Sequence, residues 1–135
     1  MKVYLSASSS ELPRVRHWGA RVTDAGMSVS LYWFDGAEAW AGRDQDKAIE
    51  AQRSVAAEQA RAIANCGVFW LLFPSEPRES SALIELGYAL AKAPYSVVTG
   101  ARASCRVWTS LANYRDASDA LGWVYVCRIA AMKKR

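Results

Sequence analysis

Short apolar segments alternate with longer segments of helical periodicity along the whole chain. The apolar segments that we expect to be strands cover residues 2–6, 29–33, 67–73, 95–99 and 123–127. The segments that we expect to be helices cover residues 11–25, 47–65, 81–91 and 106–112. Strands and helices in alternation predict a parallel β-sheet with helices packed on both of its faces.

Right-handed crossovers between five parallel strands predict the strand order 2-1-3-4-5. The predicted fold class is therefore α/β, a flavodoxin-like three-layer sandwich. A chain of 135 residues suits one domain, so we expect residues 1–135 to form a single domain. Ser10 is the expected N-cap of the first helix and Gly26 its end, and residues 34–46, which include Trp40, are expected to form a long loop.

A run of serines follows the first predicted strand. In a sheet of this order, the segments after Ser6, Phe73 and Thr99 surround one crevice at the carboxyl ends of the strands. Ser6, Ser8 and Ser9 would bring hydroxyl and backbone N–H groups to a helix start, which suits a hydroxyl-rich or anionic ligand. A serine-rich turn that caps the helix explains these residues equally well.

Glu85 is a single carboxylate in an otherwise apolar helix start. The segment before it, residues 67–73, is apolar throughout and predicts a central strand buried on both faces. Glu85 would then lie in the crevice beyond the strand ends. The alternative, which the local pattern favours, is a first-turn glutamate that interacts with the helix dipole, worth about 0.3–1 kcal/mol.

A second carboxylate, Glu58, lies on the helix before the central strand, at the edge of the apolar face of that helix. From there it could approach the same crevice. The alternative, which spacing favours slightly, is an exposed ion pair with Arg61 on the helix surface, worth about 0.3–0.5 kcal/mol.

Composition argues against several other classes of function. Cys66, Cys105 and Cys127 are odd in number and widely spaced, and His17 is the only histidine, so we expect neither disulfides nor a metal site. The net charge of +4 comes from scattered basic residues and a basic chain end, residues 133–135, so we do not expect a nucleic-acid polymer as the partner.

The longest apolar run, residues 67–73, is far shorter than the ~20 residues that span a bilayer. The first residues enter a strand-like segment without the pattern of a signal peptide. We therefore expect a cytoplasmic protein without a membrane segment.

Three segments resemble the nucleoside 2-deoxyribosyltransferase-like family, which includes the deoxynucleoside 5′-monophosphate N-glycosidases. They are residues 2–8, the helix with Glu58 followed by residues 66–72, and above all Ile84-Glu85-Leu86-Gly87-Tyr88-Ala89. The resemblance covers the chain from Lys2 to about Thr99. It implies an N-glycosidase or deoxyribosyltransferase that cleaves the C1′–N bond of a nucleoside or nucleoside monophosphate, without a cofactor.

By position, the resemblance makes Glu85 the nucleophile that attacks the anomeric carbon, and it matches Glu58 to an acidic residue that assists proton transfer or holds the sugar. It implies that Ser80, Ser81 and Tyr88 help to bind the substrate, and that the protein forms a homodimer or larger homo-oligomer. Trp33, Trp40 and Tyr4 are candidates for stacking on the base, although aromatic residues beside strands more often belong to the core.

Two alternatives stay open. The family usually has a serine and then a glycine where this chain has Glu79 and Ser81, which motivates a non-catalytic module that binds a nucleotide derivative. The other alternative is an NAD-cleaving glycohydrolase, which would also direct a glutamate at a ribosyl C1′.

Overall fold

In a computed structural model, the chain has an α/β fold built on one parallel sheet. The structure describes residues 1–36, 45–73, 80–99, 112–114 and 117–134. The strands are β1 (Lys2–Ser6), β2 (Ser28–Val29), β3 (Val68–Leu72), β4 (Tyr95–Thr99) and β5 (Ala112–Tyr114). Their order is β2-β1-β3-β4-β5, and all neighbouring strands are parallel, which confirms the predicted sheet order.

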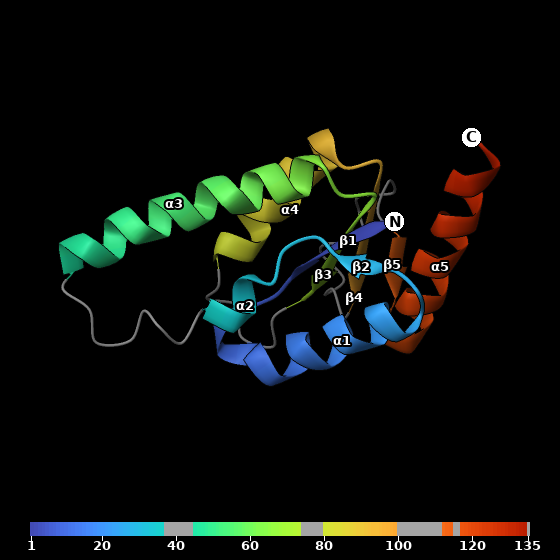
Figure 1. The fold of residues 1–135 in the computed structure, drawn as a ribbon, viewed down its shortest axis with the longest axis horizontal. Coiled ribbons are helices and arrows are strands. Elements are labelled where there is room, and N and C mark those ends of the chain that lie inside the picture. Colours follow the sequence, from blue (N-terminus) through green and yellow to red (C-terminus); the bar gives the residue numbers. More distant parts are fainter. Residues whose placement is uncertain (37–44, 74–79, 100–111, 115–116, 135) are drawn as a thin grey trace.

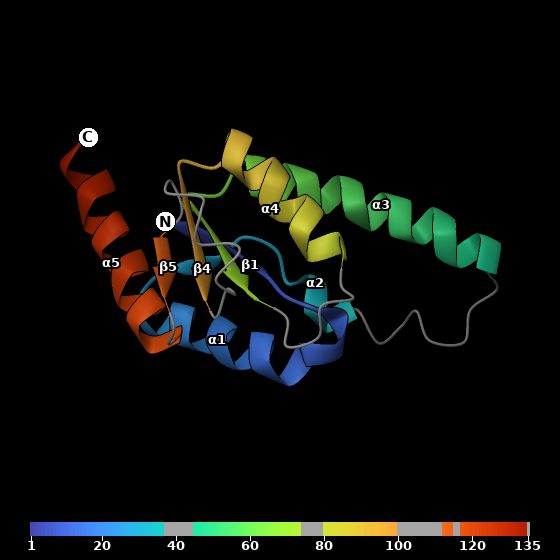
Figure 2. The same ribbon diagram turned by 180° about the vertical axis from the view of Figure 1, so that it is seen from behind.

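Helices cover both faces of the sheet. They are a 3₁₀ turn, η1 (Ser9–Glu11), and the helices α1 (Leu12–Asp24), α2 (Trp33–Gly36), α3 (Gln45–Ala64), α4 (Ser80–Lys92) and α5 (Ala117–Lys133). Figures 1 and 2 show α3 and α4 on one side of the sheet and α1 and α5 on the other. The predicted three-layer arrangement is therefore confirmed.

The alternation of side chains along the strands creates one core on each face of the sheet. Val3 and Leu5 of β1 pack in the core under α1 and α5, whereas Tyr4 packs with Phe69 and Leu71 in the core under α3 and α4. Because side chains repeat with a period of two, Ser6 lies on the same face as Tyr4. The last residue of β1 is thereby directed toward α4.

The predicted position of the fifth strand is wrong. Residues 123–127 belong to α5, and the fifth strand is Ala112–Tyr114; the rest of the helix predicted at 106–112 lies outside the described residues. The run Trp123 to Cys127 is apolar and rich in β-branched and aromatic residues, and such a run does not by itself distinguish a strand from a packed helix. The buried residues Ala120, Val124 and Cys127 follow the spacing of a helix face.

Two boundaries near the amino terminus also differ from the prediction. The second strand ends at Val29, and Trp33 begins the short helix α2. Ser8, not Ser10, caps the first helical turn, because its Oγ accepts a hydrogen bond of 3.1 Å from the N–H of Ser10. Gly26 does follow the end of α1, with a φ of 75° that favours glycine.

Helix α3 packs on the sheet mainly near its carboxyl end. Ile63 in its last turns is buried, whereas Ile49 near its start is 47% exposed. Figure 1 shows the first half of α3 extending beyond the edge of the sheet. The apolar face predicted for this helix is therefore only partly covered.

Among the described residues, no helix combines the length and the apolar character needed to cross a membrane. The cytoplasmic location expected from the sequence stays a prediction.

The central strand should dominate stability. Leu71 is fully buried in β3, so Leu71→Ala should lower the free energy of unfolding by about 2–5 kcal/mol. Leu90→Ala removes the same atoms from a side chain that is 38% exposed on α4, and it should lower stability by a smaller amount, about 1 kcal/mol. Urea denaturation followed by circular dichroism measures both values, and equal losses would contradict the assignment of the core.

Candidate active site

Glu85 points from α4 toward the carboxyl end of β1. It lies on the same helix face as the buried residues Ala82, Leu86 and Ala89, at spacings that place all four toward the sheet. Because α4 begins at Ser80, Glu85 is in the second turn and not in the first. The interaction with the helix dipole that the local pattern favoured therefore does not explain its position.

Two hydroxyl groups of β1 hold the Glu85 carboxylate. Ser6 Oγ donates a hydrogen bond of 2.5 Å to Oε2, and the Tyr4 hydroxyl donates one of 3.2 Å to Oε1. Tyr4 and Ser6 are both fully buried, and the Tyr4 ring stacks on Phe69 with 5.7 Å between ring centroids. The carboxylate is thus fixed from below by groups that the sheet itself positions. The sequence analysis named Tyr4 as a candidate for stacking on the base. In the structure its ring stacks on Phe69 and its hydroxyl group donates to Glu85.

Burial controls the ionisation of these groups. Desolvation raises the pKa of Glu85 above its ordinary value, and the hydrogen bonds from Ser6 and Tyr4 oppose that rise. Burial and the adjacent Glu85 charge raise the pKa of Tyr4, so its hydroxyl stays protonated and remains a donor.

A cavity of about 340 Å³ opens above Glu85, between α3 and α4. Helix α4 lines it with Ser81, Ile84, Glu85 and Tyr88, and helix α3 lines it with Ala56, Gln59, Ala60 and Ile63. A volume of this order is within the range of small-molecule pockets. Ser81 and Tyr88, which the resemblance named, therefore lie beside Glu85.

Glu58 does not line this cavity within the described part of the chain. Its side chain is exposed, and the neighbouring residue Gln59 takes the inward position. The Gln59 amide lowers the pKa of Tyr4, so it lies near the hydroxyl group that donates to Glu85. The sequence contained a signal for Gln59, because Ala56, Gln59, Ala60 and Ile63 repeat at the spacing of one helix face.

The remaining predicted site residues fall in three groups. Trp33 is half-buried near the carboxyl end of β1, where its Nε1 donates a hydrogen bond of 2.7 Å to the Leu5 carbonyl oxygen. Ser8 is buried and caps η1. The side chains of Ser9 and Ser80 and the whole of Trp40 lie outside the described residues.

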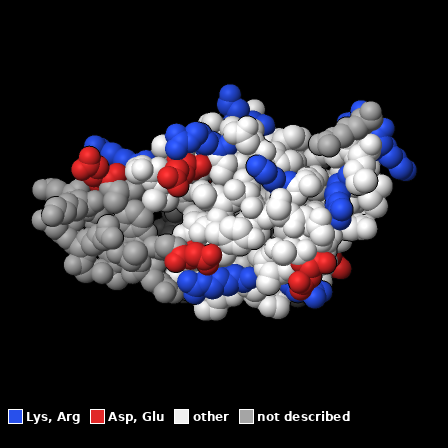
Figure 3. Space-filling model, viewed as in Figure 1, with Lys and Arg blue, Asp and Glu red and all other residues white. Residues whose placement is uncertain are grey.

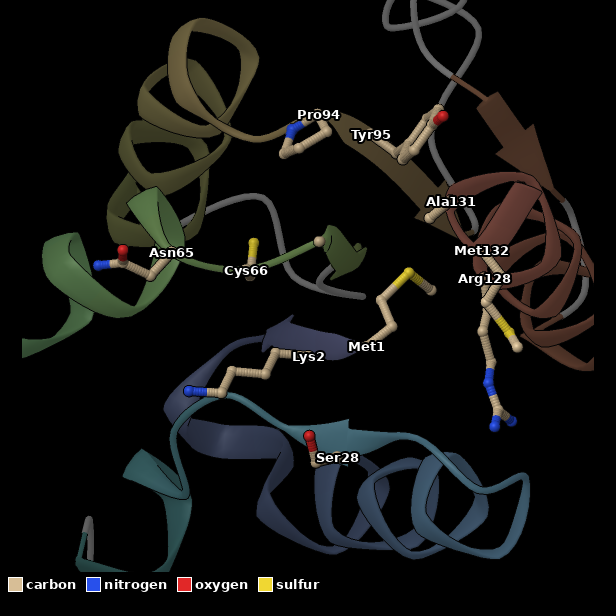
Figure 4. A pocket seen from close by; sticks show the side chains of 11 residues that line it. Met1, Lys2, Ser28, Asn65, Cys66, Pro94, Tyr95, Arg128, Ala131 and Met132 are labelled. Atoms are coloured by element: carbon tan, nitrogen blue, oxygen red, sulfur yellow. The ribbon is translucent and has the colours of Figure 1, made fainter. Parts of the chain in front are cut away.

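A second cavity lies at the other end of the strands, near the amino ends of β1, β3 and β4. It has a volume of about 650 Å³, and Figure 4 shows Met1, Cys66, Tyr95 and Arg128 among the side chains around it. Arg128 donates a hydrogen bond of 3.0 Å to the Ala25 carbonyl oxygen, and the Cys66 thiol contacts the Ile63 carbonyl oxygen at 3.1 Å. Both polar groups are thus engaged by the protein, and the cavity lies away from Glu85.

The described residues include two of the three cysteines and much of the charged surface. Cys66 and Cys127 are free and buried, and burial raises the pKa of each thiol to about 11. The described residues contain no cluster of histidine, cysteine and acidic side chains that could hold a metal ion. Figure 3 shows basic and acidic side chains interspersed on one face, with Lys and Arg gathered toward the end of α5.

Two solved structures share this fold. A 2-deoxyribosyltransferase from Bacillus psychrosaccharolyticus superposes with a TM-score of 0.68 at 16% identity, over 90% of each chain. The CMP N-glycosidase of Clostridium botulinum superposes with a TM-score of 0.58 at 17% identity, over 93% of this chain and 99% of that chain. No protein-family model and no curated protein matches the sequence. At these identities the likeness shows the fold that the sequence resemblance implied.

The raised pKa of Glu85 predicts how stability depends on pH. A carboxyl whose pKa is higher in the folded than in the unfolded state favours folding in its neutral form. That contribution is complete below the unfolded pKa, about 4.3 for glutamate, and is lost as the pH rises through the folded pKa. Glu85→Gln should therefore gain stability over the wild type as the pH rises from about 4 toward 7.

Urea unfolding at a series of pH values measures this difference. Glu50→Gln, which removes an exposed carboxylate from α3, controls for the loss of one charge. The prediction is contradicted if the stability of Glu85→Gln relative to the wild type is the same at acid and at neutral pH. It is also contradicted if that relative stability falls toward neutral pH.

Proposed function

We propose that the protein cleaves the C1′–N bond of a nucleoside or nucleoside monophosphate with Glu85 as the nucleophile, as a member of the nucleoside 2-deoxyribosyltransferase-like group. The observation that carries this proposal is the Glu85 carboxylate, held by Tyr4 and Ser6 beside a cavity of about 340 Å³. The fold shared with a 2-deoxyribosyltransferase and a CMP N-glycosidase supports the same kind of reaction.

The geometry suits a covalent mechanism at an anomeric carbon. An ionised carboxylate has about four lone-pair sites, and the two hydrogen bonds from β1 occupy one on each oxygen. The remaining sites can face C1′, stabilise the oxocarbenium-like transition state and form a glycosyl ester, while the C1′–N bond breaks and its electron pair leaves with the base. Water, or a second base, then attacks C1′ and releases the carboxylate.

Ser81 and Tyr88 line the same cavity and are proposed to contact the sugar or the base. Trp33 and the serines Ser6, Ser8, Ser9 and Ser80 belong to the segments around the carboxyl ends of the strands. We assign Ser6 to the carboxylate and not to the substrate, because its Oγ is buried and donates to Glu85.

Self-association into a dimer or larger assembly is part of the proposal. Leu83 and Ile84 of α4 are 45% and 72% exposed, and Ile49 of α3 is also exposed, so this side of the molecule offers apolar surface.

The nucleophile can be tested against the second predicted acid. Glu85→Gln should lower kcat for base release on the order of 10³-fold or more, as loss of a catalytic nucleophile does. Glu58→Gln should retain activity, because the Glu58 side chain is exposed and does not line the cavity. Chromatography of a panel of ribo- and deoxyribonucleosides and their monophosphates, with and without an acceptor base, measures both.

Failure of the wild-type protein to release or exchange any base would refute the N-glycosidase proposal. Nucleotide-induced thermal stabilisation without turnover would then favour the non-catalytic binding module. Loss of activity in Glu58→Gln with retention in Glu85→Gln would reverse the residue assignment.

Tyr4 should position and tune the carboxylate. Its hydrogen bond lowers the pKa of Glu85, so Tyr4→Phe should raise that pKa. Because the nucleophile must be ionised, the acid limb of the kcat/KM profile should move to higher pH. A lower kcat with an unmoved acid limb would contradict this role.

A further inference from the structure

The cavity beside Glu85 combines one carboxylate with walls that are mostly apolar. Among its described lining residues, Ala56, Ala60, Ile63 and Ile84 are apolar, and Gln59, Ser81 and Tyr88 are polar but formally uncharged. A carboxylate next to such walls attracts a positive charge more strongly than it would in water, because the local dielectric constant is lower. Tyr88, 37% exposed, also presents an aromatic ring, a group that interacts favourably with cations.

The charge of the base also decides what its departure requires. When the C1′–N bond breaks, the electron pair moves to the ring nitrogen. A neutral base becomes an anion at that moment and needs a proton from an acid. A base that already carries a positive charge becomes neutral and leaves without a proton.

Among the described residues that line the cavity, Glu85 is the only one with a carboxyl group, and none carries an imidazole. Gln59, which faces the cavity from α3, is an amide. Tyr4 keeps its proton because burial and the Glu85 charge raise its pKa. This set stabilises the carboxylate and suits a leaving group that supplies its own positive charge.

We propose that the preferred substrates are N-glycosides whose base is permanently cationic, such as pyridinium nucleosides and nucleotides or N7-alkylated purine nucleosides. This proposal rests on the N-glycosidase function proposed above. The C1′–N bond breaks with its electron pair moving to the ring nitrogen, and a bond forms between Glu85 and C1′. Water then cleaves the ester, giving the free sugar, the neutral base, the regenerated carboxylate and one proton released to solvent.

Guanosine and 7-methylguanosine form a matched pair of probes, because they share the sugar and differ by one methyl group and one positive charge. Since the methylated compound is also more labile without enzyme, kcat/KM is divided by the uncatalysed rate constant for each. This enhancement should be on the order of 100-fold larger for 7-methylguanosine, the lower end of what general acid catalysis contributes. Nicotinamide riboside should also be cleaved.

Gln59→Glu places a carboxyl group in the cavity wall and tests the same idea in reverse. It should raise activity on guanosine relative to 7-methylguanosine by about tenfold or more, and add a falling limb at high pH for guanosine only. Ser54→Glu adds the same group to the exposed face of α3 and should leave the ratio unchanged.

The wild-type pH profile keeps the test decisive if Gln59→Glu does not fold. With nicotinamide riboside, whose pyridinium charge does not titrate, kcat/KM should rise as Glu85 ionises and then reach a plateau. The titratable neighbours of Glu85 among the described residues are Tyr4 of β1 and Tyr88 of α4, which lines the same cavity.

The outcomes separate the two proposals. An equal or larger enhancement for guanosine, or a falling limb with nicotinamide riboside, would overturn the preference for cationic bases and leave the N-glycosidase function standing. Cleavage of neither guanosine, 7-methylguanosine nor nicotinamide riboside would overturn the preference, and the wider substrate panel would then decide the N-glycosidase function separately.

Discussion

The contact between Glu85 and the first strand is the interaction on which the candidate site depends. It joins α4 to β1 across the interface between helix layer and sheet, through Tyr4 and Ser6. The two donors come from alternate positions of one strand, so their separation is set by the strand itself. A carboxylate held in this way has little rotational freedom, and its orientation is fixed before any substrate arrives.

The same contact has a cost that the rest of the fold must offset. Burial disfavours the charged form of Glu85, and the two hydroxyl groups compensate only in part, since the pKa remains raised. The buried strands around it supply the opposing stabilisation, because β3 is buried along its whole length. An inward carboxylate in an otherwise apolar helix face is the kind of local inconsistency that function explains better than stability does.

The sequence predicted the sheet well because strands β1, β3 and β4 are short apolar segments bounded by polar residues or helices. It failed at residues 123–127, because apolar and β-branched residues serve a helix as well as a strand where both pack on a sheet. For the candidate site, the inward position of Glu85 could be predicted from the sequence. Glu58 was chosen as the second residue of the site because it is charged, whereas its neighbour Gln59 lines the cavity. Which of two adjacent residues faces inward depends on the phase of the helix, and Ile63 fixes that phase in favour of Gln59.

The way α3 is attached has a further consequence for the cavity. Ile63 anchors the helix to the sheet, while the helix start extends beyond the sheet edge with Ile49 exposed. Gln59 lies one turn from the anchor, and Ala56 lies almost another turn farther out. Helix α3 is therefore attached to the core at Ile63, and the cavity wall at Ala56 belongs to the part of the helix that leads away from this attachment. The two ends of the α3 wall of the cavity thus differ in support, because the core holds the wall at Ile63, while beyond Ala56 the helix leads to the exposed Ile49.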